Sequence, residues 1–388
     1  MHYELSYCSI KRLCALRRSD SHDKYAPLSS SDGIGCQIFL NIHLVSGQSC
    51  SCSSLIIPVH VDVLIPKDPA DSFGGLKSNA SDLRRLNETY DVFGVLCRPN
   101  TAPPGNPDAI QLLVHGFTYT NQYWSPPIEE FRNYSYTAFA CDRGLSSLAI
   151  DLVGVGLSSR PTNASDVQYA TNAAVLSQLA RHLKTVPILP RIQPFKKVIA
   201  IGHSAGSATL TYGAIAEGRQ SPFDGLILTG NLNIPPGTLP GLPGVMSARD
   251  DTPLRWGGLD PDYITTNNRS LFYPANPTCF SPRMLTFDAF TKDVGPISSQ
   301  LQGSVTTLAS EYSGPVAKVA GSEDQGFCAA EKCVDVAALY AREHVFWPEA
   351  QIFEVVVAQG SGHDLNLDFF AKGPFNTFVR LVEQFAGL

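Results

Sequence analysis

The stretch Ile199-Ala-Ile-Gly-His-Ser-Ala-Gly-Ser-Ala208 is the part of the sequence on which the fold assignment rests. It contains the pattern Gly-x-Ser-x-Gly with Ser204 at its centre, and in a chain with 31 glycines this pattern alone is weak evidence. Its surroundings are more specific, because an apolar run at 197–201 precedes it and a predicted helix at 209–217 follows it. A strand that turns directly into a helix exposes the residue on the turn, so Ser204 is predicted to be a nucleophile.

From about residue 55 onward, short apolar runs alternate with longer amphipathic runs, as they do in chains of strand-helix-strand units. The predicted strands are 55–64, 90–97, 109–114, 148–150, 197–201, 225–229, 316–320 and 352–358. The predicted helices are 128–141, 167–184, 209–217, 329–343 and a C-terminal helix after Pro374. The pattern therefore indicates an α/β fold with a mostly parallel eight-stranded sheet flanked by helices.

Residues 232–315 interrupt this alternation. Eleven of the 28 prolines fall there, together with Trp256, Phe272 and Phe287, and 281–312 has a helical pattern. A loop of this length without secondary structure is improbable in a compact domain, so we expect a lid inserted after the sixth strand. The domain is predicted to span 49–388, with 1–48 as an unstructured segment or a degenerate leader outside the fold.

A serine hydroxyl needs a base to take its proton, and His363 is the predicted base. It lies in Gln359-Gly-Ser-Gly-His-Asp364, directly after the last predicted strand. Sites in open parallel sheets gather at the carboxyl ends of the strands, where this loop is expected to be. His203 neighbours the nucleophile, but the turn is expected to direct it away. The alternative is that His363 is a loop histidine without a catalytic role.

The acid that orients the base is expected after a strand between Ser204 and His363. Gly321-Ser-Glu-Asp324 follows the strand at 316–320, so Asp324 is the predicted acid and Glu323 the alternative. The strand before the lid ends near Asn231, which carries no negative charge and is excluded.

Two backbone amides are predicted to bind the oxyanion that forms when a carbonyl is attacked. One is the amide of Ala205 at the start of the helix after the nucleophile, where the helix dipole favours negative charge. The other is the amide of Phe117, in the His115-Gly-Phe117 segment that follows the strand at 109–114. His115 itself is expected to have a structural role.

Several classes of function are disfavoured by composition. The formal net charge is -6 and no long basic run is present, so a nucleic-acid partner is not expected. No window approaches eighteen uninterrupted apolar residues, which argues against a membrane span. Gly154-Val-Gly156 lacks the third glycine of a dinucleotide fingerprint, and no cysteine pair has a complementary pair of metal ligands. We therefore expect no metal and no cofactor.

Export through the secretory pathway is favoured by ten cysteines and by glycosylation sequons at Asn79, Asn87, Asn133, Asn163 and Asn268. We expect disulfides between Cys52 and Cys97, which lie on neighbouring predicted strands, and between Cys328 and Cys333. The leader is atypical, because its basic pairs at 11–18 are separated from the apolar run at 38–45. A cytoplasmic location is the alternative.

The order of these motifs, His-Gly, Asp-x-x-Gly-x-Gly-x-Ser at 151–158, Gly-His-Ser-Ala-Gly, Gly-Ser-Glu-Asp and Gly-Ser-Gly-His, resembles the α/β-hydrolase superfamily over about residues 50–388. Within it, the segments 52–59 and 112–124 and the ending Gly-Ser-Gly-His-x-Leu-Asn-Leu look like a group of secreted fungal hydrolases of mostly unassigned substrate. The resemblance implies the α/β-hydrolase fold and a Ser-Asp-His triad.

The expected function is hydrolysis of a carboxylic ester, thioester or lactone of an apolar substrate through an acyl-enzyme. Tyr119, Trp124, Trp256, Phe272 and Phe287 are the predicted substrate contacts, although the same aromatics could form the core of the lid. The alternatives are acyl transfer, cyclisation or lyase chemistry in a secondary-metabolite pathway, and a non-catalytic binding protein. The sequence leaves the substrate and the oligomeric state open.

Overall fold

The computed structural model describes residues 39–40, 50–72, 79–100, 109–190, 192–233, 244–302, 307–328 and 333–388. Only Phe39–Leu40 of the predicted leader is among them, as the short strand β1 paired with Leu55 and Ser54. The rest of segment 1–48 lies outside the described residues, and its prediction as a leader stays a prediction.

The sheet contains the eight predicted strands plus β1, in the order β1-β2-β3-β5-β4-β6-β7-β11-β12. The strands are β2 (Cys50–Pro66), β3 (Leu83–Pro99), β4 (Ala109–Val114), β5 (Ser146–Ile150), β6 (Lys197–His203), β7 (Gly225–Thr229), β11 (Val316–Gly321) and β12 (Phe353–Ala358). From β5 to β12 every neighbouring pair is parallel, whereas β3 is antiparallel to both β2 and β5. The predicted α/β fold with a mostly parallel sheet is therefore confirmed.

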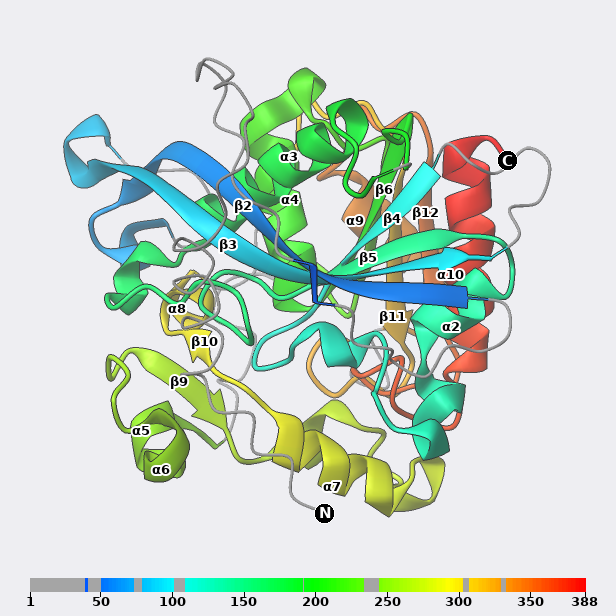
Figure 1. Ribbon diagram of the computed structural model, residues 1–388. Helices are drawn as coiled ribbons and strands as arrows, with labels where there is room; N and C mark the ends of the chain where they lie inside the picture. The colour runs from blue at the N-terminus through cyan, green and yellow to red at the C-terminus, as the bar shows by residue number, and fades with distance from the viewer. Residues whose placement is uncertain are drawn as a thin grey trace, which may run out of the picture. The chain divides into compact units, whose positions relative to one another are not determined.

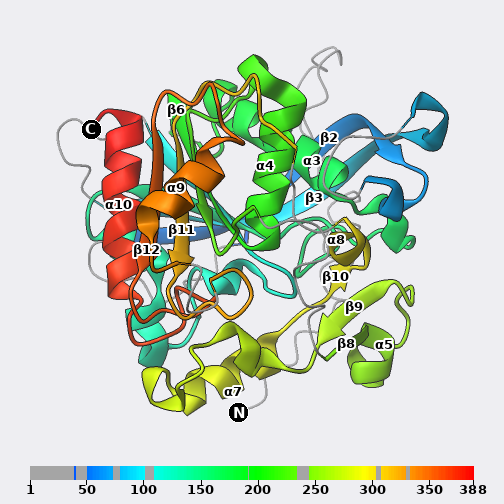
Figure 2. The ribbon, with the colours of Figure 1, turned by 180° about the vertical axis from the view of Figure 1, so that it is seen from behind.

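Helices cover both faces of this sheet (Figure 1, Figure 2). The helices are α2 (Tyr136–Cys141), α3 (Tyr169–Thr185), α4 (Ala205–Glu217), α9 (Val336–His344) and α10 (Lys372–Ala386). Leu112 of β4 packs in the cluster formed with α3 and α4, whereas its neighbour Leu113 packs in the cluster formed with α2 and α10. Successive strand residues thus bury opposite faces, which explains why β4 is apolar throughout.

One disulfide lies within the long β2–β3 hairpin, and another joins the hairpin to a helix. All 17 residues of β2 pair with β3, and Cys52 and Cys97 are partners in that register and form a disulfide, as predicted. A second disulfide, Cys50 to Cys141, joins the start of β2 to the end of α2. The sequence did not indicate it, because Cys50 and Cys141 come together only after the chain packs α2 beside β3. Cys328 and Cys333 form the other predicted bridge.

Two predicted helical segments are interrupted, and the helix predicted at 329–343 begins only at Val336. The segment 128–141 is a 3-10 helix at Glu129–Tyr134 followed by α2, and Ser135 separates them because its hydroxyl caps α2 by accepting from Ala138 N at 3.2 Å. The segment 281–312 holds α7 (Pro282–Thr291) and α8 (Ser298–Leu301), with the two-residue strand β10 (Gly295–Pro296) between them. Helical periodicity did not reveal either break.

The predicted lid region contains an insertion with its own small sheet, which we call the insertion (described residues 244–302). Its elements besides α7, α8 and β10 are β8 (Val245–Ser247), α5 (Ala248–Asp251), α6 (Pro253–Trp256) and β9 (Tyr263–Thr266). The three strands β8, β9 and β10 pair antiparallel. The insertion is drawn in yellow-green and yellow at the bottom of both ribbon views (Figure 1, Figure 2). Its action as a lid stays a prediction.

The loop 151–158 after β5 is organised around the buried carboxylate of Asp151. One carboxylate oxygen accepts from Asn121 N at 2.7 Å and the other from Leu157 N at 2.9 Å. Gly156 has φ +57°, and a side chain there would place its Cβ 2.1 Å from Asp151 Oδ2. The glycine of this motif is therefore required by both backbone conformation and space.

We expect Gly156→Ala to destabilise the protein by about 1–4 kcal/mol, because alanine is strained at positive φ and collides with Asp151. Gly258→Ala is the matched control, since a Cβ at Gly258 has no atom within 4 Å and the expected change is within ~0.5 kcal/mol. Urea denaturation of both variants measures the difference. Equal midpoints for the two variants would contradict this account of the loop.

Candidate active site

Ser204 occupies the sharp turn between β6 and α4. Its φ is 51° and its ψ is -116°, a conformation that non-glycine residues rarely adopt. Its amide donates to Thr229 O at 2.8 Å, which ties the turn to the end of β7. The turn also needs small neighbours, because a Cβ on Gly206 would lie 2.5 Å from His115 O and one on Gly202 would lie 2.7 Å from Ser207 N.

His363 and Asp324 form a buried pair on two neighbouring loops. Nδ1 of His363 lies 2.8 Å from Asp324 Oδ2. The other oxygen of Asp324 accepts from the amides of Gly326 and Phe327 at 2.9 and 3.0 Å, and the Phe327 ring stacks on the imidazole with centroids 5.6 Å apart. Asp324 is thus oriented by its own loop, whereas the alternative acid Glu323 is exposed.

The pKa of His363 depends on two opposing effects. Burial alone would lower it, but the nearby Asp324 carboxylate and its hydrogen bond raise it above the ordinary 6.5. Because Nδ1 faces Asp324, Nε2 is the ring nitrogen left to exchange a proton with a substrate or a nucleophile. The pair therefore has the arrangement of a base with an orienting acid.

The end of β7 brings Ser204 and His363 into the same region. The carbonyl of Thr229 accepts from the Ser204 amide, and Gly230 follows directly. A Cβ on Gly230 would lie 3.2 Å from His363 Cε1, so the imidazole packs against this glycine. His203 points away from the turn surface, as expected, and is fully buried with its ring stacked on Tyr123 at 4.3 Å.

The loop after β4 places Phe117 beside the start of α4. A cavity next to the turn is lined by both Phe117 and Ala205, the residues whose amides are the predicted oxyanion donors. His115 holds this loop, because its Nε2 accepts from Leu152 N at 3.0 Å and its Nδ1 donates to Gly116 O at 2.8 Å. Burial lowers the pKa of His115 to about 4, which keeps it neutral and suits the structural role expected for it.

The same cavity has a volume of about 30 Å³ and opens to solvent. Its walls come from the 151–158 loop, the start of α3, the start of α4 and the insertion around β10. Its apolar lining side chains include Leu152, Val153, Val155, Tyr169, Val294 and Pro296, and its polar ones include Gln168, Asn172 and Thr209. None of these was singled out from the sequence. The position of Val153 and Val155 inside the Asp-x-x-Gly-x-Gly-x-Ser motif was the one available signal.

The five predicted substrate contacts lie in different surroundings. Phe272 is close to the pair, with its ring 5.5 Å from that of His363, and Tyr119 lies 6.0 Å from Phe272. Trp124 is fully buried against Tyr136 in the sheet core. Trp256 packs inside the insertion with Tyr263 and Val294, and Phe287 packs on Phe131. None of the five lines the cavity at Phe117 and Ala205, and neither Ser204 nor His363 is among the residues that line it.

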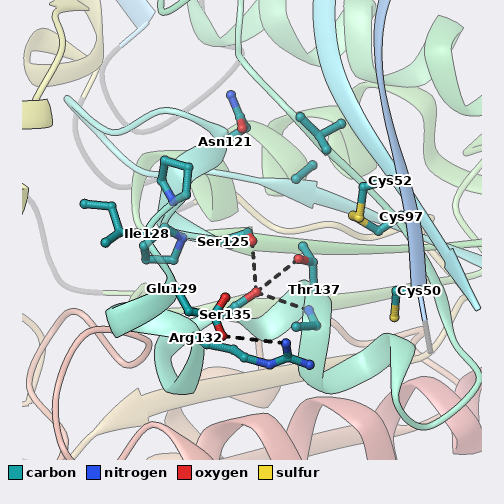
Figure 3. A pocket seen from close by; sticks show the side chains of 15 residues that line it. Cys50, Cys52, Cys97, Asn121, Ser125, Ile128, Glu129, Arg132, Ser135 and Thr137 are labelled. Atoms are coloured by element: carbon teal, nitrogen blue, oxygen red, sulfur yellow. Dashed lines mark hydrogen bonds and ion pairs between the residues drawn. A yellow bond between two sulfur atoms is a disulfide. The ribbon is translucent and has the colours of Figure 1, made fainter. Parts of the chain in front are cut away.

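A second and larger cavity lies away from these residues, between the β2–β3 hairpin and the segment 125–138 (Figure 3). Figure 3 shows the Cys52–Cys97 disulfide beside it and Ser135 at the centre of a hydroxyl cluster with Ser125 and Thr137. No predicted site residue lines this cavity. Within the described ranges, no cluster of three metal-ligating side chains is found, nor is any helix both long and apolar enough to cross a membrane.

The chain is similar to a known protein family and to solved structures. A model of the alpha/beta hydrolase family matches residues 111–371, which is more than half of the chain. A solved structure from Burkholderia cenocepacia, provisionally described as an aryl esterase, is 17% identical with a TM-score of 0.50, covering 77% of this chain and 97% of its own. The peroxisomal α/β-hydrolase Lpx1 from Saccharomyces cerevisiae is 13% identical with a TM-score of 0.49, covering 88% and 90%.

No curated protein matches the sequence. The solved structures are too distant to show more than the fold, so the assignment rests on the family model and on the strand order with its turn at Ser204. The chain belongs to the alpha/beta hydrolase family.

Proposed function

We propose that the protein is a serine hydrolase that cleaves a carboxylic ester, thioester or lactone of an apolar substrate through an acyl-enzyme. The observation that carries the proposal is the buried Asp324–His363 pair beside the strained turn that presents Ser204. A buried, oriented base close to a half-buried serine on a strained turn is what nucleophilic catalysis requires.

In the proposed reaction Ser204 Oγ attacks the carbonyl carbon while His363 Nε2 takes the hydroxyl proton. Asp324 holds the imidazolium that forms, and the amides of Phe117 and Ala205 bind the oxyanion. His363 then returns the proton to the leaving alcohol or thiol. A water molecule, activated by the same ring, hydrolyses the acyl-enzyme, and no cofactor is needed.

The cavity lined by Phe117 and Ala205 supports the proposed substrate class. Its side chains are mostly aliphatic or aromatic, so an apolar acyl or alcohol group is the proposed occupant. The same acyl-enzyme could pass its acyl group to an alcohol or amine instead of water, which is the second reading. A product analysis with added alcohol distinguishes the two, because transfer yields a new ester whereas hydrolysis yields the free acid.

We also propose that the protein is exported, in line with its resemblance to secreted fungal hydrolases. Three disulfides among the described residues and exposed side chains at the sequon residues Asn87, Asn133 and Asn163 support this location.

Ser204→Ala and His363→Ala are each expected to lower kcat by several orders of magnitude on nitrophenyl acetate. The double variant should lose little more than either single variant, because the two residues act as one unit. Steady-state kinetics of the three variants, with labelling by a fluorophosphonate probe, measures this. If the fold-loss of kcat in the double variant equals the product of the two single losses, the result argues against the triad.

The activity is expected to fall as pH drops through the raised pKa of His363, because only the neutral ring accepts a proton. The acidic midpoint of kcat/KM should therefore lie above pH 6.5. Asp324→Asn removes the anion that raises this pKa, so the midpoint should move to lower pH while the plateau falls roughly 10³ to 10⁴ fold. Glu323→Gln is the control and should leave both quantities near wild type. A larger effect of Glu323→Gln would transfer the acid role to Glu323.

Ser299→Phe is expected to narrow the cavity, since Ser299 is a half-buried lining residue from the insertion. The kcat/KM for an octanoyl ester, divided by that for an acetyl ester, should fall by a factor that corresponds to about 1–3 kcal/mol. Trp256→Leu is the control, because Trp256 packs inside the insertion and should lower the melting temperature without changing the ratio. A changed ratio in Trp256→Leu alone would restore the predicted role of Trp256 as a substrate contact.

A further inference from the structure

The backbone of Thr118 is strained. Its φ is 61°, and among the described non-glycine residues only Ser204 shares a positive φ. A β-branched residue is especially unfavourable in this region, so the conformation persists only if surrounding contacts hold it. Thr118 follows Phe117, the residue whose amide is the predicted oxyanion donor, and its side chain is buried.

The insertion holds Thr118 from two sides. Arg269 Nη1 donates to Thr118 Oγ1 at 2.5 Å, and the amide of Asp293 donates to Thr118 O at 2.9 Å. The Thr118 hydroxyl in turn donates to Phe117 O at 2.7 Å. The carbonyl of Phe117 is thus tied, through one hydroxyl, to a guanidinium of the insertion.

Arg269 is itself rigidly placed. It is 2% exposed, and its guanidinium donates to the buried Asp288 through Nε at 3.1 Å and through Nη2 at 2.7 Å. The guanidinium carbon also lies 4.2 Å from the centre of the Tyr119 ring and 4.7 Å from that of Phe272. Burial alone would lower the pKa of Arg269, but Asp288 and its hydrogen bonds raise it, so the residue stays charged.

The same cluster reaches the loop of the catalytic histidine. The Tyr119 hydroxyl donates to the buried Asp364, which directly follows His363. Oδ1 of Asp364 also lies 3.4 Å from Nε2 of the fully buried His203, the neighbour of Ser204. The insertion, the oxyanion loop and the histidine loop therefore share one buried polar network, and Arg269 is the residue of the insertion at its centre.

We propose that Arg269 is a positioning residue that fixes the oxyanion loop through Thr118, so that the insertion completes the oxyanion hole as well as lining the cavity. The inference rests on the proposed serine hydrolase function for its catalytic consequence. Its structural part, the fixing of residues 116–119 by a contact from the insertion, is independent of that function.

The first test compares Thr118→Val with Thr118→Ser. Valine has nearly the same shape but removes the hydroxyl that links Arg269 to Phe117, whereas serine keeps it. Thr118→Val should lower kcat on nitrophenyl acetate by roughly 10 to 100 fold, less than the complete loss of an oxyanion donor, with KM changed little. Affinity for a trifluoromethyl ketone should fall in parallel, because that inhibitor forms the tetrahedral oxyanion. Thr118→Ser should retain most of the wild-type kcat and most of the affinity for the ketone.

The second test separates positioning from general destabilisation. Arg269→Lys keeps a positive charge for Asp288, but it loses the guanidinium that binds Asp288 and Thr118 at the same time. It should therefore lower kcat, as Thr118→Val does. Met284→Ala is the matched control, because Met284 is fully buried in α7 of the insertion, the helix that also carries Asp288. It should lower the melting temperature while kcat and ketone affinity at 25 °C stay near wild type. Equal kcat losses in Met284→Ala and Arg269→Lys at matched stability would overturn the positioning role.

The third test does not depend on catalysis. Amide hydrogen exchange of a peptide covering 116–120 should become faster in Thr118→Val and Arg269→Lys and stay unchanged in Met284→Ala. Unchanged exchange in the first two variants would overturn the inference. If wild-type protein neither hydrolyses esters nor reacts with a fluorophosphonate, the proposed function fails, and the oxyanion role fails with it. Faster exchange would then still show that Arg269 fixes the loop.

Discussion

The close approach of the β6–α4 turn to the end of β4 is the constraint on which the site depends. Gly206 lies so near the carbonyls of Val114 and His115 that no side chain fits between them. This contact places the amide end of α4 beside the loop that carries Phe117, and Ser204 in the same turn has a φ of 51°. The strain is held by the surrounding sheet, since the Ser204 amide is bonded to the end of β7.

Around that turn, the site is built from loops at the carboxyl ends of parallel strands. β4, β6, β11 and β12 lead into the segments with Phe117, Ser204, Asp324 and His363, respectively. Hydrogen bonds hold these loops, both within one loop, as the two amides that bind one oxygen of Asp324 do, and between distant segments, as Arg269 does with Thr118. Pre-organised loops of this kind would reduce the rearrangement needed when charge develops in the proposed reaction.

The insertion lines the cavity with other residues than the aromatic ones that its composition suggested. Its aromatic residues mostly pack among themselves or on the sheet core, as Trp256 and Phe287 do. The side chains that line the cavity come instead from the short segment around β10 and from α8. The α8 segment is held against α3 by hydrogen bonds from Ser298 to Val167 O at 2.5 Å and from Tyr169 to Ser299 O at 3.1 Å. Aromatic residues in an insertion are thus poor guides to substrate contacts, because they also stabilise the insertion.

The sequence by itself determined where the strands lie along the chain and which candidate site residues follow them. Apolar runs of strand length and the residues directly after them depend on local rules, so all eight strands and the positions of Ser204, Asp324 and His363 at strand ends could be predicted. It also indicated the Cys52–Cys97 disulfide, because those residues lie on strands adjacent along the chain.

Only the tertiary structure decided contacts between segments far apart in sequence. The choice of Asp324 over Glu323 depends on which carboxylate the loop directs inward. Three examples join distant segments. The Cys50–Cys141 disulfide spans 91 residues. The cavity wall brings together Tyr169 and Val294, which are 125 residues apart, and Arg269 contacts Thr118 across 151 residues. Side chains at such separations meet through packing, and no periodicity or local motif records which of them will touch.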